Sequence, residues 1–97
     1  MAESAIDLQR DHPAYAGHFP GRPILPAVVL VAEALAGIER DTGHGPAHWT
    51  LGNAKFPRPV EPGTPLTLAH EPTPAGLRFE IRSPGGIVAS GTLAPRE

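Results

Sequence analysis

The chain has 97 residues and an apolar fraction of 40%, which is enough for one small core and too little for two domains. Its formal net charge is −2 and its 8 Lys and Arg residues are scattered, so we expect neither a nucleic-acid partner nor a membrane partner. The absence of cysteine excludes disulfides and thiolate metal sites, and no leader or membrane-spanning segment is visible, so we expect a cytoplasmic protein.

The first third of the chain predicts a strand, a long loop and a helix. Residues 4–10 alternate apolar and polar side chains, which is typical of a half-buried strand. Residues 11–26 contain four prolines and two glycines, which favour a stiff loop. Pro26 then opens a helix over 27–40, with Gly43 as its stop. The first two turns of this helix are apolar on every side, so we expect it to be buried all round.

The remainder predicts four strands joined largely by turns. The expected strands are residues 49–56, 65–70, 77–83 and 87–94. Residues 71–76 and 84–86 are the expected turns, the second of them a tight hairpin. In the last strand, Ile87, Ala89, Gly91 and Leu93 are expected to share one face. The order of elements predicts an α+β fold in which an antiparallel sheet wraps around one long central helix.

The segment over 11–26 carries the most chemical information. It holds the imidazole of His18 in a rigid loop just before the start of a helix. A helix start has unpaired N–H groups and a partial positive charge, so it can polarise a carbonyl oxygen. An imidazole can accept a proton near neutral pH. This combination suits proton abstraction next to a carbonyl group.

Three blocks of sequence resemble the 3-hydroxyacyl-acyl-carrier-protein dehydratases of bacterial fatty-acid synthesis and their aryl-polyene and pigment relatives. Residues 17–27 read Gly-His-Phe-Pro-Gly-Arg-Pro-Ile-Leu-Pro-Ala, and ten of these eleven positions fit the family pattern. Residues 55–63, Lys-Phe-Pro-Arg-Pro-Val-Glu-Pro-Gly, are similar to a second family block, and residues 88–91, Val-Ala-Ser-Gly, to a third. The blocks occur in the family's order and cover nearly the whole chain.

The resemblance implies a single hot-dog domain over residues 1–97 and a homo-oligomer with active sites at the subunit interface. It implies that His18 removes the C2 proton of an acyl thioester, and that the N–H of Ala27 polarises the thioester carbonyl. Substrate contacts would come from Phe19, Gly21, Pro26 and Ala27, and acyl carrier protein would be the partner. The small size of the chain independently favours oligomerisation. No cofactor and no metal is expected.

Two positions depart from the family pattern. Ala27 stands where the family has glycine, and its methyl group narrows the approach to the helix start. Ala32 stands where the family has the Asp or Glu that helps to expel the hydroxyl group as water. Glu33 follows and is the candidate acid, although one residue along a helix is about 100° of rotation. A local π-bulge could bring its carboxylate back.

Other interpretations of these residues stay open. His18 could be a structural turn residue, and Glu33 could be an ordinary carboxylate on a stripe shared with Arg40. Lys55 and Arg58 could recognise phosphopantetheine or the acidic carrier protein, or be ordinary surface charges. His44 and His48 are spaced like a metal pair, but Gly45 and Pro46 between them argue against the aligning helix.

Three functions follow, in decreasing order of preference. The first is a dehydratase, a hydro-lyase that acts on a 3-hydroxyacyl thioester. The second is an accessory hot-dog subunit with impaired catalysis, which binds acyl carrier protein or pairs with an active homologue; Ala32 favours it. The third is a hot-dog thioesterase that uses a water activated by a carboxylate such as Glu33.

Overall fold

The computed structural model describes residues 2–6, 26–61 and 63–96. Their secondary structure, in chain order, is β1 (Ala2–Ile6), α1 (Ala27–Thr42), a short 3-10 helix η2 (Pro46–His48), β2 (Trp49–Lys55), β3 (Leu66–Thr73), β4 (Gly76–Ser83) and β5 (Gly86–Pro95). The expected helix and strands are therefore present, and most boundaries are displaced by a few residues. Residues 7–10 of the strand expected over 4–10 lie outside the described residues. The predicted loop over 11–26 lies outside the described residues except for Pro26, which precedes α1 with φ −62° and ψ 145°.

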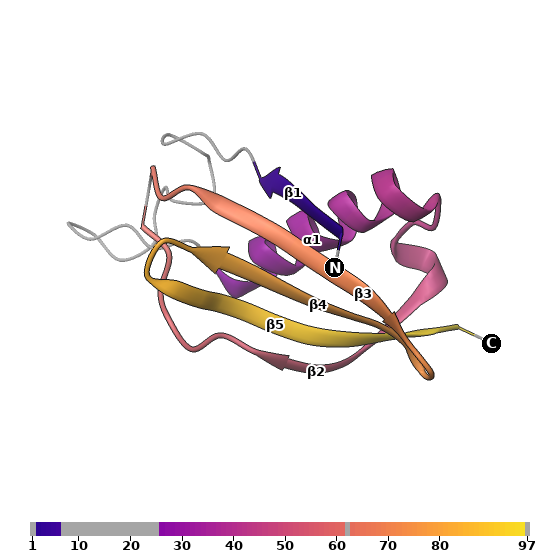
Figure 1. Ribbon diagram of the computed structural model, residues 1–97. Coiled ribbons are helices and arrows are strands. Elements are labelled where there is room, and N and C mark those ends of the chain that lie inside the picture. The colour runs from indigo at the N-terminus through magenta and orange to yellow at the C-terminus, as the bar shows by residue number, and fades with distance from the viewer. Residues whose placement is uncertain (1, 7–25, 62, 97) are drawn as a thin grey trace.

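The strands form one antiparallel sheet in the order β1-β3-β4-β5-β2. The helix α1 crosses one face of this sheet and packs against β1, β3 and β4 (Figure 1). The predicted α+β class, an antiparallel sheet curved around one helix, is confirmed. Because β2 pairs with β5 on one side only, its outer edge is unpaired among the described residues.

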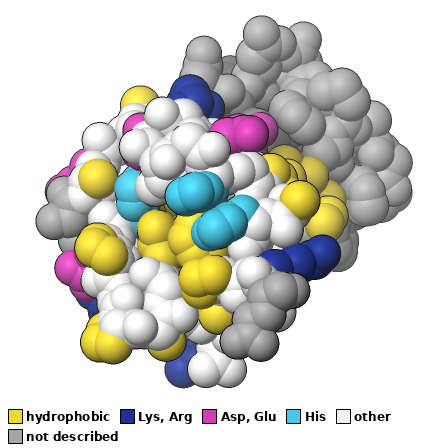
Figure 2. All heavy atoms as spheres, turned by 90° about the vertical axis from the view of Figure 1, so that its right-hand side faces the viewer, with side chains coloured by type: hydrophobic (Ala, Val, Ile, Leu, Met, Phe, Trp, Pro, Cys, Tyr) yellow, Lys and Arg dark blue, Asp and Glu magenta, His cyan; other side chains and the backbone are white. Residues whose placement is uncertain are grey.

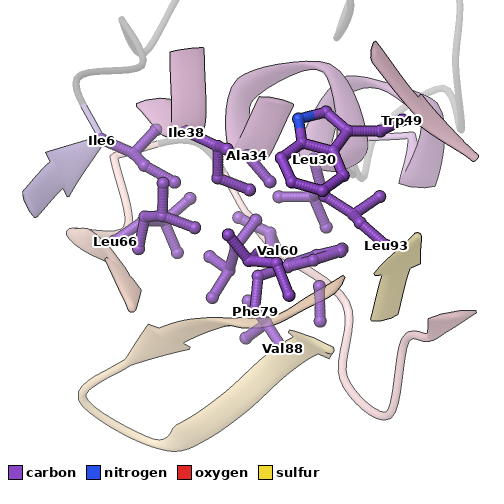
Figure 3. Close-up of a cluster of buried hydrophobic side chains, with 14 residues drawn as sticks. Ile6, Leu30, Ala34, Ile38, Trp49, Val60, Leu66, Phe79, Val88 and Leu93 are labelled. Atoms are coloured by element: carbon purple, nitrogen blue, oxygen red, sulfur yellow. The ribbon is translucent and has the colours of Figure 1, made fainter. Parts of the chain in front are cut away.

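The core lies between α1 and the sheet, and Figure 3 shows the helix side chains pointing toward those of the strands. The buried stripe of the helix consists of Leu30, Ala34, Gly37 and Ile38. Glycine at position 37 allows close approach, because a Cβ atom there would lie 2.4 Å from Cδ2 of Leu68. Small residues thus set the distance between helix and sheet.

Gly91 has a similar role inside the sheet. A Cβ atom at this position would lie 2.8 Å from the ring of Phe79 and 2.7 Å from the carbonyl oxygen of Asn53. Phe79 is 1% exposed and is one of the largest buried side chains. The glycine of the third sequence block therefore makes room for the aromatic ring at the centre of the core.

The prediction that α1 is buried on every side is wrong for the isolated chain. Val28 is 72% exposed, and Ala27 and Ala32 are exposed as well. One sheet face can cover only one side of a helix, so the opposite side of this helix keeps apolar residues uncovered. Exposed apolar residues that share one side of a helix are typical of a surface that another chain covers.

The prediction for the last strand is also partly wrong. Ala89, Gly91 and Leu93 are buried as expected, but Val88 is 2% exposed whereas Ile87 is 40% exposed. The register between β4 and β5 shifts at this point, since Ile81 pairs with Ala89 while the next residue, Arg82, pairs with Ile87. The extra residue is a β-bulge, which reverses the inward and outward alternation beyond it.

The predicted turn over 71–76 is shorter in the structure. Strand β3 continues to Thr73, so that Pro72 is a strand residue paired with Leu77. The described pairing of β1 with β3 ends at His70, so β3 borders β4 alone at Pro72. A strand with an open side tolerates the missing N–H of proline.

Among the described residues, no helix has both the length and the apolar character needed to cross a membrane.

Candidate active site

The start of α1 is the part of the predicted site that the structure describes. The helix begins at Ala27 directly after Pro26, and the N–H of Val29 donates to the carbonyl oxygen of Pro26 at 3.0 Å. The residue at the cap provides no side-chain hydrogen bond, and the first turn has no acidic residue. The amide of Ala27 therefore belongs to an exposed helix start with a partial positive charge, and it donates to no acceptor within the described residues. Such a group can hold a carbonyl oxygen that gains negative charge.

The other predicted residues of the loop lie outside the described residues. These are His18, Phe19 and Gly21, so their roles stay predictions. Of the predicted substrate contacts, Pro26 is half-buried and Ala27 is exposed at the helix start. Pro26, the last residue of the predicted loop, therefore lies directly before the exposed helix start.

The helix is α-helical from Ala27 to Thr42, so no π-bulge occurs at Glu33. Ala32 is exposed on the same apolar side as Val28, one turn away, whereas Glu33 is half-buried. Glu33 shares its stripe with Gly37, and the guanidinium of Arg40 lies 3.4 Å from where a Cβ of Gly37 would be. The carboxylate of Glu33 therefore leaves the helix about 100° away from position 32.

The start of α1 shares one end of the molecule with the end of β2 and the turn between β4 and β5 (Figure 1). Lys55 is the last residue of β2, and Arg58 follows it in the connection to β3. Both side chains are exposed. The second sequence block therefore reaches the same end of the molecule as the helix start.

The described histidines lie away from the helix start, at the end that Figure 2 faces. The rings of His44 and His48 stack with centroids 4.0 Å apart and an interplanar angle of 13°, and Trp49 meets His48 edge-on. Stacked rings direct their nitrogen lone pairs along parallel planes rather than toward one ion. Within the described ranges, no three His, Cys, Asp or Glu side chains are grouped to hold a metal ion.

The contact of buried His70 with the partly exposed Asp41 was not predicted from the sequence. Nε2 of His70 lies 2.7 Å from Oδ2 of Asp41, and His70 is only 5% exposed. The pair joins the last turn of α1 to β3. The two residues are 29 positions apart, so no local sequence pattern indicates their contact.

Comparison with known proteins gives a family and a fold. The model of the ApeI-like family, described as ApeI dehydratase, matches residues 1–92. The 3-hydroxyacyl-[acyl-carrier-protein] dehydratase FabZ of Brucella ovis is 42% identical over 66 residues, which are 60% of this chain and 42% of that protein. The namesake from Agrobacterium fabrum is 39% identical over 76 residues, covering 67% of this chain and 49% of that protein. The chain thus spans less than half the length of these curated relatives.

Two solved structures have the same fold. The dehydratase heterocomplex ApeI:P from Xenorhabdus doucetiae superposes with a TM-score of 0.79 at 22% identity, covering 98% of this chain and 86% of that one. The dehydratase domain of the polyketide protein PpsC from Mycobacterium tuberculosis gives 0.76 at 23% identity, covering 98% of this chain and 38% of that one. The hot-dog fold is therefore confirmed.

Proposed function

Because the chain belongs to the ApeI-like dehydratase family, we propose that it dehydrates 3-hydroxyacyl thioesters carried by acyl carrier protein, in fatty-acid or related polyene synthesis. The observation that carries this proposal is the exposed start of α1, which Pro26 does not cap with a side-chain hydrogen bond and which lies at the end of the sequence block that contains His18. We further propose that residues 1–97 form one domain and that the protein is a cytoplasmic homo-oligomer.

The proposed reaction removes water across C2 and C3 of the acyl chain. The N–H of Ala27 donates a hydrogen bond to the thioester carbonyl oxygen, which acidifies the proton on C2. The imidazole of His18 takes that proton, and the electron pair of the C–H bond becomes the second bond between C2 and C3. The C3 hydroxyl leaves with a proton from an acid, as water. Phe19, Gly21 and Pro26 line the path of the acyl chain.

Glu33 is the acid that we propose from this chain. It is half-buried, and it makes no ion pair within the described part of the chain. A carboxylic acid can act as a general acid by donating its proton to the leaving hydroxyl group. Position 32, the family's acid position, cannot contribute, since alanine has no proton to transfer.

A second candidate function is favoured by the exposure of Ala32. In this alternative the chain is an accessory subunit that pairs with an active homologue, and the homologue contributes the carboxylate. Ala32 lies on the uncovered apolar side of α1, where another chain could pack. The name of the similar structure from Xenorhabdus doucetiae describes a heterocomplex, which supports pairing between different subunits.

The first test is direct dehydration by the purified protein. We expect it to convert 3-hydroxyacyl carrier protein to the trans-2-enoyl product, measured by mass spectrometry of the carrier. His18→Ala removes the proposed base and should lower kcat by about 10²–10⁴-fold. Equal turnover by the wild type and His18→Ala would exclude the proposed role of the imidazole.

A pair of helix variants separates the two candidate functions. If Glu33 is the acid, Glu33→Gln should lower kcat by about 10²–10⁴-fold, and Ala32→Asp should change it little. If the chain is an accessory subunit, the wild type should be inactive alone and Ala32→Asp should create turnover. Full activity of Glu33→Gln would remove Glu33 from the mechanism.

A further inference from the structure

A hollow lies at the end of the molecule where α1 ends, away from the helix start that carries the proposed function (Figure 1). Its volume is about 520 Å³, which falls within the usual range of small-molecule sites. Four elements supply its lining residues, which are Ala2, Thr42, His70, Glu71, Pro72 and Leu77. His70 and Leu77 are buried, whereas Ala2, Thr42 and Pro72 are exposed. The hollow therefore has a buried floor and an open rim.

The polar group on the floor of this hollow is the imidazole of His70. Its Nε2 lies 2.7 Å from Oδ2 of Asp41, and a carboxylate partner at Nε2 holds the N–H on that nitrogen. The other nitrogen, Nδ1, then carries a lone pair, and it makes no hydrogen bond within the described part of the chain. In the same part of the chain, the fully buried polar side-chain atoms without a partner are Oγ of Ser4 and Nε1 of Trp49. Nδ1 of His70 is thus an accessible acceptor on a residue that lines the hollow.

The other polar side chains of the lining are already engaged. Oγ1 of Thr42 donates to the carbonyl oxygen of Ile38 at 2.8 Å and accepts from the N–H of His44 at 3.2 Å. The carboxylate of Glu71 accepts from Arg78 at 2.5 Å. Because a hydroxyl group has one proton and a carboxylate has none, the lining side chains offer hydrogen-bond acceptors and no free donor.

The remainder of the lining is apolar. Leu77 is 4% exposed, and it pairs with Pro72, which has no N–H to donate. Ala2 is the partner of His70 in the pairing of β1 with β3, and the described pairing ends there. The methyl group of Ala2 therefore lies at the rim, beside the part of β3 that β1 does not border.

We propose that this hollow binds a small neutral molecule with an apolar body and one hydroxyl group, such as a phenol or an alcohol. The hydroxyl group donates to Nδ1 of His70, and the apolar body packs against Leu77 and Pro72. A carboxylate ligand does not match the site, because no lining side chain donates to it and the carboxylate of Asp41 lies behind the imidazole. The site is separate from the helix start, so it stands or falls independently of dehydration.

The first test compares ligands that differ in one hydrogen-bond donor. para-Ethylphenol is titrated into the isotope-labelled protein at about pH 8, where a free imidazole is neutral, and Kd is obtained from NMR chemical shifts. para-Ethylanisole keeps the apolar body but has a methyl group in place of the hydroxyl proton. It should bind about tenfold more weakly, which corresponds to the loss of one hydrogen bond. Equal affinity of the two ligands would overturn the proposal, and so would tighter binding of para-ethylbenzoate.

A substitution at the floor assigns the hydroxyl group to its acceptor. His70→Gln keeps an N–H for Asp41 and has no acceptor at the position of Nδ1. It should weaken binding of para-ethylphenol by about tenfold and leave the Kd of para-ethylanisole unchanged. Circular dichroism checks that the variant is folded. An unchanged Kd for para-ethylphenol in the folded variant would contradict the role of the imidazole.

A pair of variants on β1 locates the ligand without disturbing the floor. Ala2→Phe places a ring at the rim and should weaken binding of both ethyl compounds by at least about tenfold, because the ring occupies the hollow. Ala5→Phe is the matched control, since Ala5 is exposed on the same strand but does not line the hollow, and it should change neither Kd. Equal Kd values for the two variants would place the ligand elsewhere and overturn the site.

Discussion

At the scale of single residues, polar side chains in this small protein have very different surroundings. The imidazole of His70 is buried and its partner Asp41 is partly exposed, with side-chain exposures of 6% and 35%. The pair of Arg78 and Glu71 is open to water, with exposures of 49% and 38%. Because burial decides the cost of losing a partner, contacts of similar length should differ in their contribution to stability.

This contrast gives a prediction for two substitutions. Asp41→Ala leaves the imidazole N–H of His70 buried without its acceptor and should lower the free energy of unfolding by about 1–3 kcal/mol. Glu71→Ala removes a surface pair and should cost at most about 1 kcal/mol. Urea unfolding, followed by circular dichroism at pH 7, measures both variants. Equal losses in the free energy of unfolding would show that the burial of His70 does not make its contact with Asp41 more stabilising than the exposed pair of Arg78 and Glu71.

At the scale of secondary-structure elements, glycines decide where backbone segments meet. Gly76 begins β4 with φ 155°, and a Cβ atom there would lie 2.1 Å from the carbonyl oxygen of Leu93. Gly43 ends α1 with φ 81°, but a Cβ atom there would meet nothing within 4 Å. A Cβ atom at position 76 would thus combine backbone strain with a clash against backbone atoms, whereas a Cβ atom at position 43 would introduce strain alone.

We therefore expect the two glycine-to-alanine variants to differ. Gly43→Ala should cost about 1–2 kcal/mol, the usual cost of a left-handed residue with a Cβ atom. Gly76→Ala should cost more, since the clash is with backbone atoms of β5 and can be relieved only by moving a strand. Thermal unfolding by calorimetry measures the difference. A smaller loss for Gly76→Ala than for Gly43→Ala would contradict the described approach of β4 and β5.

At the scale of the whole molecule, one chain leaves apolar surface uncovered. Leu51 of β2 pairs with Leu93 of β5, so both point to the same side of the sheet. Leu93 is 3% exposed and Leu51 is 42% exposed. The helix packs against β1, β3 and β4, so this side of β2 remains exposed, and the Val28 side of α1 is exposed as well. A second chain on this surface, together with the free edge of β2, would complete the burial.

The predicted cover of this surface by a second chain can be tested by measuring the size of the assembly in solution. We expect the wild type to sediment as a dimer or larger assembly in analytical ultracentrifugation. Val28→Asp and Leu51→Asp should each shift the population toward the monomer, because a carboxylate would be buried in the interface. Ala75→Asp, on the exposed turn between β3 and β4, is the control and should keep the assembly. A monomeric wild type would contradict the homo-oligomer and leave pairing with a different subunit.

Local patterns in the sequence were sufficient for the order of elements and for much of the fold. The alternation of Leu77, Phe79 and Ile81 with charged residues correctly predicted the inner face of β4, and Gly43 correctly predicted the end of α1. These features depend on residues close together in the chain, where side-chain period and backbone preference act directly. The motif around His18 likewise indicated a family, to which the chain belongs.

Tertiary structure decided what depends on distant parts of the chain. Which side of α1 is buried follows from the single sheet face that covers it, and the outward turn of Ile87 follows from a bulge between β4 and β5. The contact of His70 with Asp41 also arises only when β3 and the last turn of the helix come together. Local periodicity carries no information on register or on charge pairing across elements, because both are set by packing between segments far apart in sequence.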